Sequence, residues 1–370
     1  MNISLLLYVS SANYRLKPKK FLIFIKNDME KVNLNSRREF LQKLLAASAV
    51  AGFYPYLDTV TELNSTQTNK GKLPVRPLGR TGHMVGIYSL GGQATLETIG
   101  KEELSVQIIN RAIDLGINYI DTAAAYGRAT PTIPKAEAAG HSERNIGQVM
   151  KSRRKEVFLA SKTNDRTYDG SMRLLEKSLK NLQTDHLDLW QIHNLVTSQI
   201  SSVDKYFAAD GVVKALEKAR DQKMVRFLGI TGHESPEILK IMSERFPFDN
   251  VLVALNAADK HHDPFIEKFL PTAVEKKMGI VGMKIPARDR IFAHGGIITI
   301  KEAMEYVMSL PVSTIIIGLD DIAQLEENIK IAQNFKPLTA DQMLAIEAKT
   351  KPYYKELMFY KLLSEWPVEW

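Results

Sequence analysis

The chain has 370 residues, of which 45% are hydrophobic and 25% charged, enough for one large domain with tails or for two domains. Its net charge is +7, yet it has no nucleic-acid motif and no basic run interleaved with aromatic residues, so we expect no nucleic-acid partner. The absence of cysteine excludes disulfides, thiolate metal sites and iron–sulfur ligation, and it leaves the redox compartment open.

Residues 1–56 resemble an export signal region. Their short apolar runs are too short to span a bilayer, so no stable membrane span is expected. The pair Arg37-Arg38 precedes a Phe-Leu step and a weakly apolar stretch, which resembles a twin-arginine (Tat) signal. The resemblance implies the Tat export machinery as partner and a periplasmic location; the alternative is a basic helix start in a cytoplasmic protein. Met29 would give the signal a usual spacing, which makes residues 1–28 a candidate mis-called start.

Regular alternation of strand-like and helix-like segments begins at Leu73, after a polar linker at 57–72. The first element is a hairpin over 75–84 with its turn at 79–82. Strands are then predicted at 85–90, 117–122, 157–162, 187–193, 225–231, 251–257, 279–285 and 313–318. Helices are predicted at 101–115, 142–151 with Ser142 as N-cap, 171–182, 211–222, 235–246, 264–277, 301–309 and 322–332.

Eight strands alternating with eight helices predict an α/β fold, a closed (β/α)8 TIM barrel over residues 73–335. The strands are continuous apolar runs, as strands covered on both faces must be. An open doubly wound sheet is the alternative, but Gly91-Gly92-Gln93 after the first strand is not a glycine-rich dinucleotide turn. Residues 336–370 remain as a C-terminal helical extension, for which an amphipathic helix packed on the barrel is one interpretation.

Ionisable residues stand at or just after the C-terminal ends of three consecutive predicted strands, where a barrel holds its functional groups. They are Asp121 with Tyr126, then Lys162, then His193. We expect the Lys162 ammonium to lower the pKa of Tyr126 and Asp121 to hold that ammonium in place. Tyr126 would then protonate the oxygen of a carbonyl substrate oriented by a neutral His193. No side chain supplies a hydride, so a nicotinamide cofactor is required.

These residues belong to a set of motifs that resembles the aldo-keto reductase family over residues 73–335. The resemblance implies an eight-stranded α/β barrel that reduces an aldehyde or ketone, or oxidises the alcohol, with NAD(P)H. It also implies that Asp121, Tyr126, Lys162 and His193 are the catalytic tetrad. The motifs lie at 78–82 (Leu-Gly-Arg-Thr-Gly), 118–123 (Asn-Tyr-Ile-Asp-Thr-Ala), 126–127, 141–143 (His-Ser-Glu), 146–147, 161–162, 188–194 (Asp-Leu-Trp-Gln-Ile-His-Asn) and 324–328 (Gln-Leu-Glu-Glu-Asn).

The cofactor side departs from the family pattern in three places. Leu252 stands where the family has a Gln for the carboxamide, and Lys284 stands where an aromatic residue stacks on the nicotinamide. Thr231-Gly232 replaces a Ser-Asn pair. These departures keep open the alternative of a catalytically silent barrel that acts as a nucleotide-binding or protein-interaction module. The resemblance implies cofactor contacts from Asn194, Thr231, Lys284, Arg288, Gly318, Asp320, Gln324, Glu327 and Asn328.

Cofactor choice is predicted from the charge after the last strand. Asp320 and Asp321 stand near the place where NADP-preferring members carry cations, and a second negative group facing them would be repelled. Lys330 or the loop at 288–290 can compensate, so NAD is favoured only slightly over NADP. The alternative is that Asp320 caps the final helix. No metal is expected at the His261-His262-Asp263 cluster, although one of its histidines is a candidate for the substrate mouth.

Overall fold

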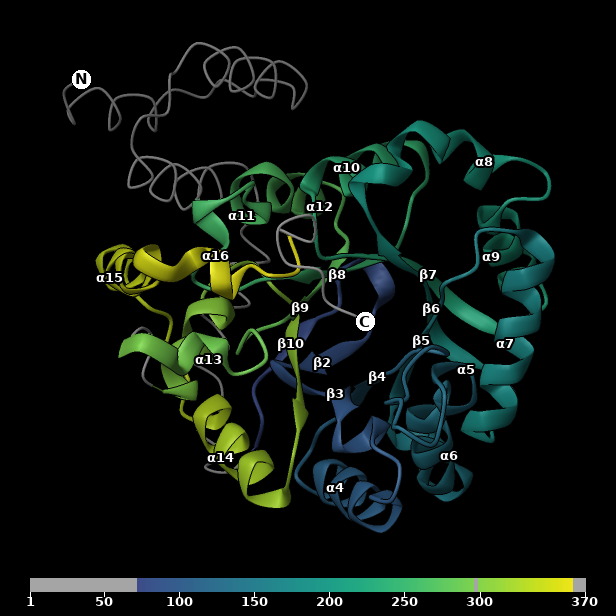
Figure 1. Ribbon diagram of the computed structural model, residues 1–370, viewed down its shortest axis with the longest axis horizontal. Coiled ribbons are helices and arrows are strands. Elements are labelled where there is room, and N and C mark those ends of the chain that lie inside the picture. The colour runs from purple at the N-terminus through teal and green to yellow at the C-terminus, as the bar shows by residue number, and fades with distance from the viewer. Residues whose placement is uncertain (1–71, 296–298, 362–370) are drawn as a thin grey trace, which may run out of the picture. The chain divides into compact units, whose positions relative to one another are not determined.

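The structure is a computed structural model in which residues 72–295 and 299–361 are described (Figure 1). These residues belong to one compact unit of the chain, Thr68–Trp370. The predicted export signal at 1–56 lies outside the described residues, and so does the predicted linker apart from Lys72. Within the described ranges, no helix combines the length and apolarity that crossing a bilayer requires.

Eight parallel strands close into a barrel in the order β10-β3-β4-β5-β6-β7-β8-β9, which confirms the predicted fold class. The first and last strands close it, because Ile315 and Ile317 of β10 pair with Tyr88 and Leu90 of β3. The strands are β3 (Tyr88–Ala94), β4 (Tyr119–Asp121), β5 (Phe158–Thr163), β6 (Leu187–Leu195), β7 (Val225–Gly232), β8 (Asn250–Ala254), β9 (Gly279–Met283) and β10 (Thr314–Leu319).

A two-stranded hairpin of β1 (Val75–Pro77) and β2 (Met84–Gly86) precedes the barrel. Asn118, just before β4, fixes it there by accepting from the Gly86 amide and donating to the Met84 carbonyl. The predicted first strand at 85–90 is therefore wrong at both ends. Residues 85 and 86 finish the hairpin, and the barrel strand begins at Tyr88 and continues to Ala94.

The helices form a ring around the strands (Figure 1). In the longest of them, Leu175, Ser178 and Leu182 are buried at three- and four-residue spacing. The ring consists of α4 (Glu102–Asp114), α6 (His141–Arg153), α7 (Tyr168–Leu182), α9 (Val212–Asp221), α10 (Pro236–Arg245), α11 (Phe265–Lys268), α12 (Leu270–Glu275), α13 (Ile300–Met308) and α14 (Ile322–Gln333). Two short helices lie in loops, α5 (Lys135–Ala138) after β4 and α8 (Val203–Phe207) after β6.

Two helix predictions need correction. The helix predicted at 264–277 is interrupted at Phe269 and restarts as α12, because Pro271 lacks the N–H that a continuous helix would use. Ser142 does not cap α6; Gly140 precedes the helix, and Ser142 lies in its buried first turn. The Ser142 hydroxyl donates to the Gly92 carbonyl at 2.6 Å, which attaches α6 to the C-terminal end of β3.

The C-terminal extension folds as α15 (Ala340–Thr350) and α16 (Tyr354–Leu357) and then reaches the C-terminal end of the barrel. Lys361 forms a fully buried ion pair with Asp259, in the loop after β8, at 2.6 Å. The Tyr360 hydroxyl accepts from Asn256 at 2.8 Å. The extension thus packs against the barrel and also covers part of its rim.

Of the two histidines suggested for the substrate mouth, His261 has a different role in the structure. His261 Nε2 lies 3.0 Å from the Glu347 carbonyl oxygen and 3.1 Å from the Thr350 hydroxyl, so it contacts α15. Within the described part of the chain, no group of three or more His, Cys, Asp or Glu side chains is arranged to hold a metal ion.

Candidate active site

The four predicted catalytic residues meet at the C-terminal end of the barrel. Asp121 ends β4, Lys162 lies in β5 and His193 lies in β6, three neighbouring strands of the closed sheet. Tyr126 follows β4 by five residues in a loop whose backbone turns back through a hydrogen bond from the Tyr126 amide to the Ala123 carbonyl. Adjacent parallel strands therefore deliver side chains that are far apart in the sequence to one place.

Lys162 is the centre of this group. Its fully buried ammonium forms an ion pair with Asp121 Oδ2, donates to the Thr122 carbonyl at 2.7 Å and donates to the Tyr126 hydroxyl oxygen at 3.3 Å. These three bonds use all three hydrogens of the ammonium. Because the Tyr126 oxygen accepts from Lys162, the hydrogen of the Tyr126 hydroxyl can point toward another acceptor, as a proton donor requires.

Asp121 is held by a second residue that was not predicted as part of the site. Gln191 Nε2 donates to Asp121 Oδ1 at 3.1 Å, and both side chains are buried. Gln191 stands two residues before His193 on the same strand, so both side chains face the same side of the sheet. This two-residue spacing was the sequence signal that could have identified it.

The ion pair is buried deeply enough for desolvation to matter. Burial raises the pKa of Asp121 and lowers the pKa of Lys162, while the attraction between the two groups acts against both shifts. The prediction that Lys162 lowers the pKa of Tyr126 is wrong for this structure. Burial, and then the negative charges of Asp121 and Glu97, raise the pKa of Tyr126 well above 10. Tyr126 is therefore a protonated phenol at neutral pH.

His193 lies beside the phenol, with the two ring centres 5.8 Å apart and the planes at 79°. Burial, together with the positive charges of Lys162 and Arg166, lowers the pKa of His193 well below 6.5. The imidazole is neutral near pH 7, which matches the prediction, and it can donate an N–H to a carbonyl oxygen. Arg166 fixes the end of β6 by donating to the His193 carbonyl at 2.7 Å.

Asn194 and Thr231, both predicted to contact the cofactor, are joined to each other. The Asn194 amide, in a residue with φ of 52°, donates to the Thr231 hydroxyl at 2.8 Å. The Asn194 side-chain oxygen lies 2.6 Å from Nδ1 of His233, a buried residue that directly follows β7. His233 was not predicted, although it satisfies the same rule as the tetrad: an ionisable residue at the C-terminal end of an apolar strand.

Lys284 and Arg288 lie on the other side of the mouth, in the loop after β9. Lys284 is half-buried, with its ammonium 3.5 Å from Gln93 Oε1 at the end of β3. Burial, reinforced by the positive charge of Arg288, lowers the pKa of Lys284 to about 7. Arg288 is exposed, and its guanidinium lies 5.7 Å from the centre of the Phe359 ring in the C-terminal extension.

The remaining predicted cofactor residues lie at the end of β10 and on α14. A Cβ atom on Gly318 would lie 3.1 Å from the Gln93 backbone, so a side chain there would require β3 to shift slightly. Asp321, rather than Asp320, caps α14 by accepting from the Gln324 amide at 2.8 Å, and the Gln324 side-chain oxygen accepts from the Asp320 amide. The backbone amides of Asp320 and Gln324 at the start of α14 therefore already have acceptors within the chain.

The two α14 residues predicted for the adenine edge differ in accessibility. Glu327 is exposed. Asn328 is buried, and its amide nitrogen donates to the Tyr88 hydroxyl at 3.3 Å. The Asn328 side chain therefore faces the barrel core, which corrects the expectation that it presents its amide to the cofactor.

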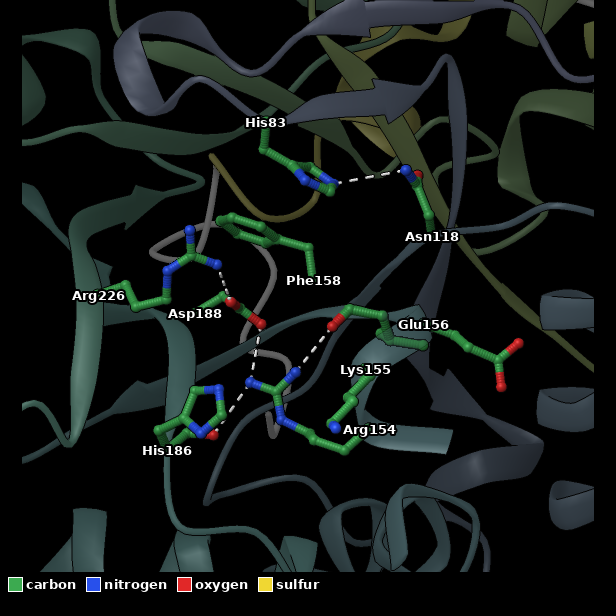
Figure 2. Close-up of a pocket in the computed structure, with 10 residues that line it drawn as sticks. His83, Asn118, Arg154, Lys155, Glu156, Phe158, His186, Asp188 and Arg226 are labelled. Carbon is green, nitrogen blue, oxygen red and sulfur yellow. Dashed lines mark hydrogen bonds and ion pairs between the residues drawn. The ribbon is translucent and has the colours of Figure 1, made fainter. Parts of the chain in front are cut away.

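A pocket of about 310 Å³ lies at the opposite, N-terminal end of the barrel (Figure 2). Its centre is Asp188, whose two oxygens pair with Arg154 at 2.8 Å and Arg226 at 2.6 Å. Asp188 Oδ2 also accepts from the Leu159 amide at 2.8 Å. These contacts cross-link the strands at this end of the barrel, and none of the four predicted catalytic residues lines the pocket.

Comparisons with known proteins agree with the geometry of the C-terminal end. A family model described as "Aldo/keto reductase family" matches residues 84–288, more than half of the chain. The oxidoreductase YqkF of Bacillus subtilis is 24% identical over 293 residues, which cover 67% of this chain and 88% of YqkF. L-Galactose dehydrogenase of Arabidopsis thaliana is 23% identical over 321 residues, covering 76% of this chain and 95% of that protein.

Solved structures are similar in fold. The holo form of an aldo-keto reductase from Bacillus halodurans has a TM-score of 0.60 at 22% identity, covering 74% of this chain and 95% of that one. An aldo-keto reductase from Klebsiella pneumoniae in complex with NADPH has a TM-score of 0.57 at 19% identity, covering 75% of this chain and 94% of that one.

Proposed function

Since the chain belongs to the aldo/keto reductase family and is an NAD(P)H-dependent oxidoreductase, we propose that it reduces an aldehyde or ketone with Tyr126 as the proton donor. The observation that carries this proposal is the bond from Lys162 to the Tyr126 oxygen, with Lys162 itself paired to Asp121. A cation on the phenol oxygen stabilises the negative charge that develops there as the proton leaves.

The roles of the other residues follow from their contacts. His193 is neutral, lies against Tyr126 and can hold the substrate oxygen by an N–H hydrogen bond while Tyr126 protonates it. Gln191 and Lys162 hold the two oxygens of Asp121, which keeps the ion pair in one orientation. A bound nicotinamide cofactor supplies the hydride that no side chain can provide.

The residues around the mouth fit such a cofactor. Arg288 is an exposed cation at the rim, where it can pair with a pyrophosphate, and Asn194 and His233 place polar groups beside His193. Leu252 is fully buried in β8, so the amide group that the resemblance expects there is absent. Asn194 and His233 are our candidates for the carboxamide in its place.

The test follows the absorbance of the reduced nicotinamide with a panel of aldehydes and ketones. We expect steady turnover by the full chain and a loss of about 10²–10⁴-fold in kcat for Tyr126→Phe, which removes the proton but keeps the ring. Phe158→Tyr serves as a matched aromatic exchange away from the tetrad. Binding of NAD(P)H without turnover of any carbonyl or alcohol would support the silent-barrel alternative.

We propose that NAD is slightly favoured over NADP. Burial, together with the negative charge of Asp320, raises the pKa of Asp289, so the acidic side chains that follow β9 and β10 repel each other. An adenosine 2′-phosphate near this pair would be repelled. The NADPH complex described above belongs to the Klebsiella pneumoniae protein, and the preference of this chain is open to direct titration.

We also propose export by the twin-arginine route, on the basis of Arg37-Arg38 and the weakly apolar stretch after it. The route carries folded proteins, which suits a barrel that can bind its cofactor before transport. Cell fractionation of Arg37→Lys plus Arg38→Lys provides the test. If the double variant reaches the periplasm as well as the wild type does, the signal assignment is wrong.

A further inference from the structure

Lys284 lies across the barrel mouth from the tetrad. In the closed order β10-β3-β4-β5-β6-β7-β8-β9, strands β4, β5 and β6 carry the tetrad, and β9 is diametrically opposite β5. Lys284 directly follows β9, so Lys284 and Lys162 start from opposite walls of the mouth, and the Lys284 ammonium extends to Gln93 at the end of β3. A substrate held at Tyr126 therefore has Lys284 across from it. A group that approaches the substrate from the side opposite Tyr126 lies between Tyr126 and Lys284.

The loop that carries Lys284 has a strained backbone. Lys284, Ala287, Arg288 and Asp289 all have φ between 49° and 65°, the left-handed region that non-glycine residues rarely adopt. The loop is held by Asn256, whose amide donates to the Lys284 carbonyl at 3.2 Å. Strain of this kind persists where the surrounding structure enforces it, and it is concentrated at functional sites.

We propose that Lys284 makes this site discriminate between the two oxidation states of the nicotinamide, so that the neutral reduced ring binds more tightly than the cationic oxidised ring. The inference rests on the proposed function, because it requires the nicotinamide to lie in the mouth. Hydride delivery to a carbonyl carbon held at Tyr126 and His193 brings the ring within contact distance of that carbon. The ring then occupies the space between the tetrad and Lys284.

The argument depends on one difference in charge. The oxidised and reduced cofactors share the same phosphates, so the attraction of Arg288 to those phosphates is nearly equal in both complexes. The oxidised ring carries one additional positive charge. A half-buried ammonium across the mouth repels that charge, and the low dielectric of the site strengthens the repulsion. In a site with an aromatic residue at this position, the oxidised ring would meet no such cation.

Among the ionisable groups at the mouth, Lys284 is the one whose charge changes near neutral pH. Glu97, on the segment after β3, opposes the lowering of the Lys284 pKa, and Arg288 and Lys162 reinforce it. His193 in β6 and His233 after β7 have pKa values well below 6.5 and stay neutral. Tyr126 has a pKa well above 10 and stays protonated. The pKa of Lys284 itself is about 7.

The experiment measures dissociation constants of NAD⁺, NADH, NADP⁺ and NADPH by quenching of intrinsic fluorescence, with no substrate and no turnover. For wild type, the ratio of the oxidised to the reduced dissociation constant should fall by about fivefold as the pH rises from 6 to 8.5. Lys284→Met should lower that ratio about fivefold at pH 6, equivalent to about 1 kcal/mol, and should remove its pH dependence. Lys284→Arg should keep a high ratio at every pH, because arginine does not deprotonate.

Lys155→Met is the matched control, because Lys155 is an exposed lysine at the opposite end of the barrel. It removes the same charge and should leave the ratio at the wild-type value. A ratio in Lys284→Met equal to wild type, with both forms still binding, would overturn the inference and leave the proposed function intact. The wild-type pH series keeps the test independent of how well a variant folds. If none of the four nucleotides binds the wild type, the proposed function fails, and this inference fails with it.

Discussion

Each end of the barrel contains a buried carboxylate held by cations, and the two are built differently. At the C-terminal end, Asp121 pairs with Lys162, which also donates to Tyr126. At the N-terminal end, Asp188 pairs with two arginines, Arg154 and Arg226, and accepts from the Leu159 amide (Figure 2). In the first pair, Lys162 also donates a hydrogen bond to Tyr126, which faces the mouth. The second is a closed cross-link between β5, β6 and β7.

The choice of cation explains the difference. Lysine can lose its proton when burial lowers its pKa, so the charge at the mouth can respond to a neighbouring reaction. Arginine stays charged and its planar fork holds a carboxylate in one geometry. The same fold thus uses lysine where a proton moves and arginine where the sheet has to be fixed.

Removing the mouth carboxylate should affect activity most. Asp121→Asn leaves Lys162 without its counter-charge, so the ammonium loses its proton more easily and no longer stabilises the Tyr126 oxygen. We expect kcat to fall by about 10²–10³-fold. An Asp121→Asn enzyme with full kcat would contradict the role assigned to the ion pair.

Removing the carboxylate at the other end should affect stability instead. Asp188→Asn leaves Arg154 and Arg226 facing each other without a negative charge, and arginine cannot relieve this by deprotonation. Because Arg226 is half-exposed and partly screened by solvent, we expect a loss of about 2–3 kcal/mol in urea unfolding, below the cost of breaking a fully buried pair. Turnover per folded molecule should stay within about twofold of wild type; a large loss would mean that the two ends are coupled.

The buried imidazole of His233 should make stability depend on pH. Its pKa in the folded chain is well below 6.5, because burial and the positive charge of Lys284 disfavour protonation. The unfolded chain takes up a proton below about pH 6.5, so below that pH the unfolded state binds more protons and stability falls as the pH falls. The limiting slope is about 1.4 kcal/mol per pH unit for one group.

His233→Asn keeps a side-chain donor for Asn194 and removes the titration. Between pH 6.5 and 5.5 this variant should lose about 1 kcal/mol less than wild type in urea unfolding. Equal losses in wild type and His233→Asn would show that His233 is not held neutral in the folded chain.

The smallest expected effect concerns cofactor choice. Asp320→Ser removes one of two acids near the end of β10 and should shift the ratio of NADPH to NADH affinity toward NADPH by about threefold, equivalent to about 0.7 kcal/mol. Asp341→Ser removes an exposed acid on α15 and should leave the ratio unchanged. Wild-type binding of NADPH about tenfold tighter than NADH would refute the preference for NAD.

The sequence predicted the barrel because its strands are continuous apolar runs separated by helices of regular spacing. It predicted Lys162 and His193 because each ionisable group stands where an apolar strand ends. It did not predict the first strand correctly, because the hairpin and β3 form one apolar stretch and only the contacts of Asn118 separate them. The pKa of Tyr126 was also out of reach, since it depends on how completely the loop is buried.

Closure between the first and last strands has a consequence for how the protein is made. Ser89 and Thr314, whose hydroxyls lie 2.8 Å apart, are separated by 225 positions along the chain. A ribosome releases β3 long before β10, so β3 keeps one open edge during most of translation. During that interval the nascent chain has an unpaired parallel strand, the kind of surface that chaperones protect. A polypeptide that ends before β10, because translation stalls or the transcript is truncated, would leave that edge unpaired permanently. We would expect this polypeptide to aggregate rather than to persist as a smaller barrel.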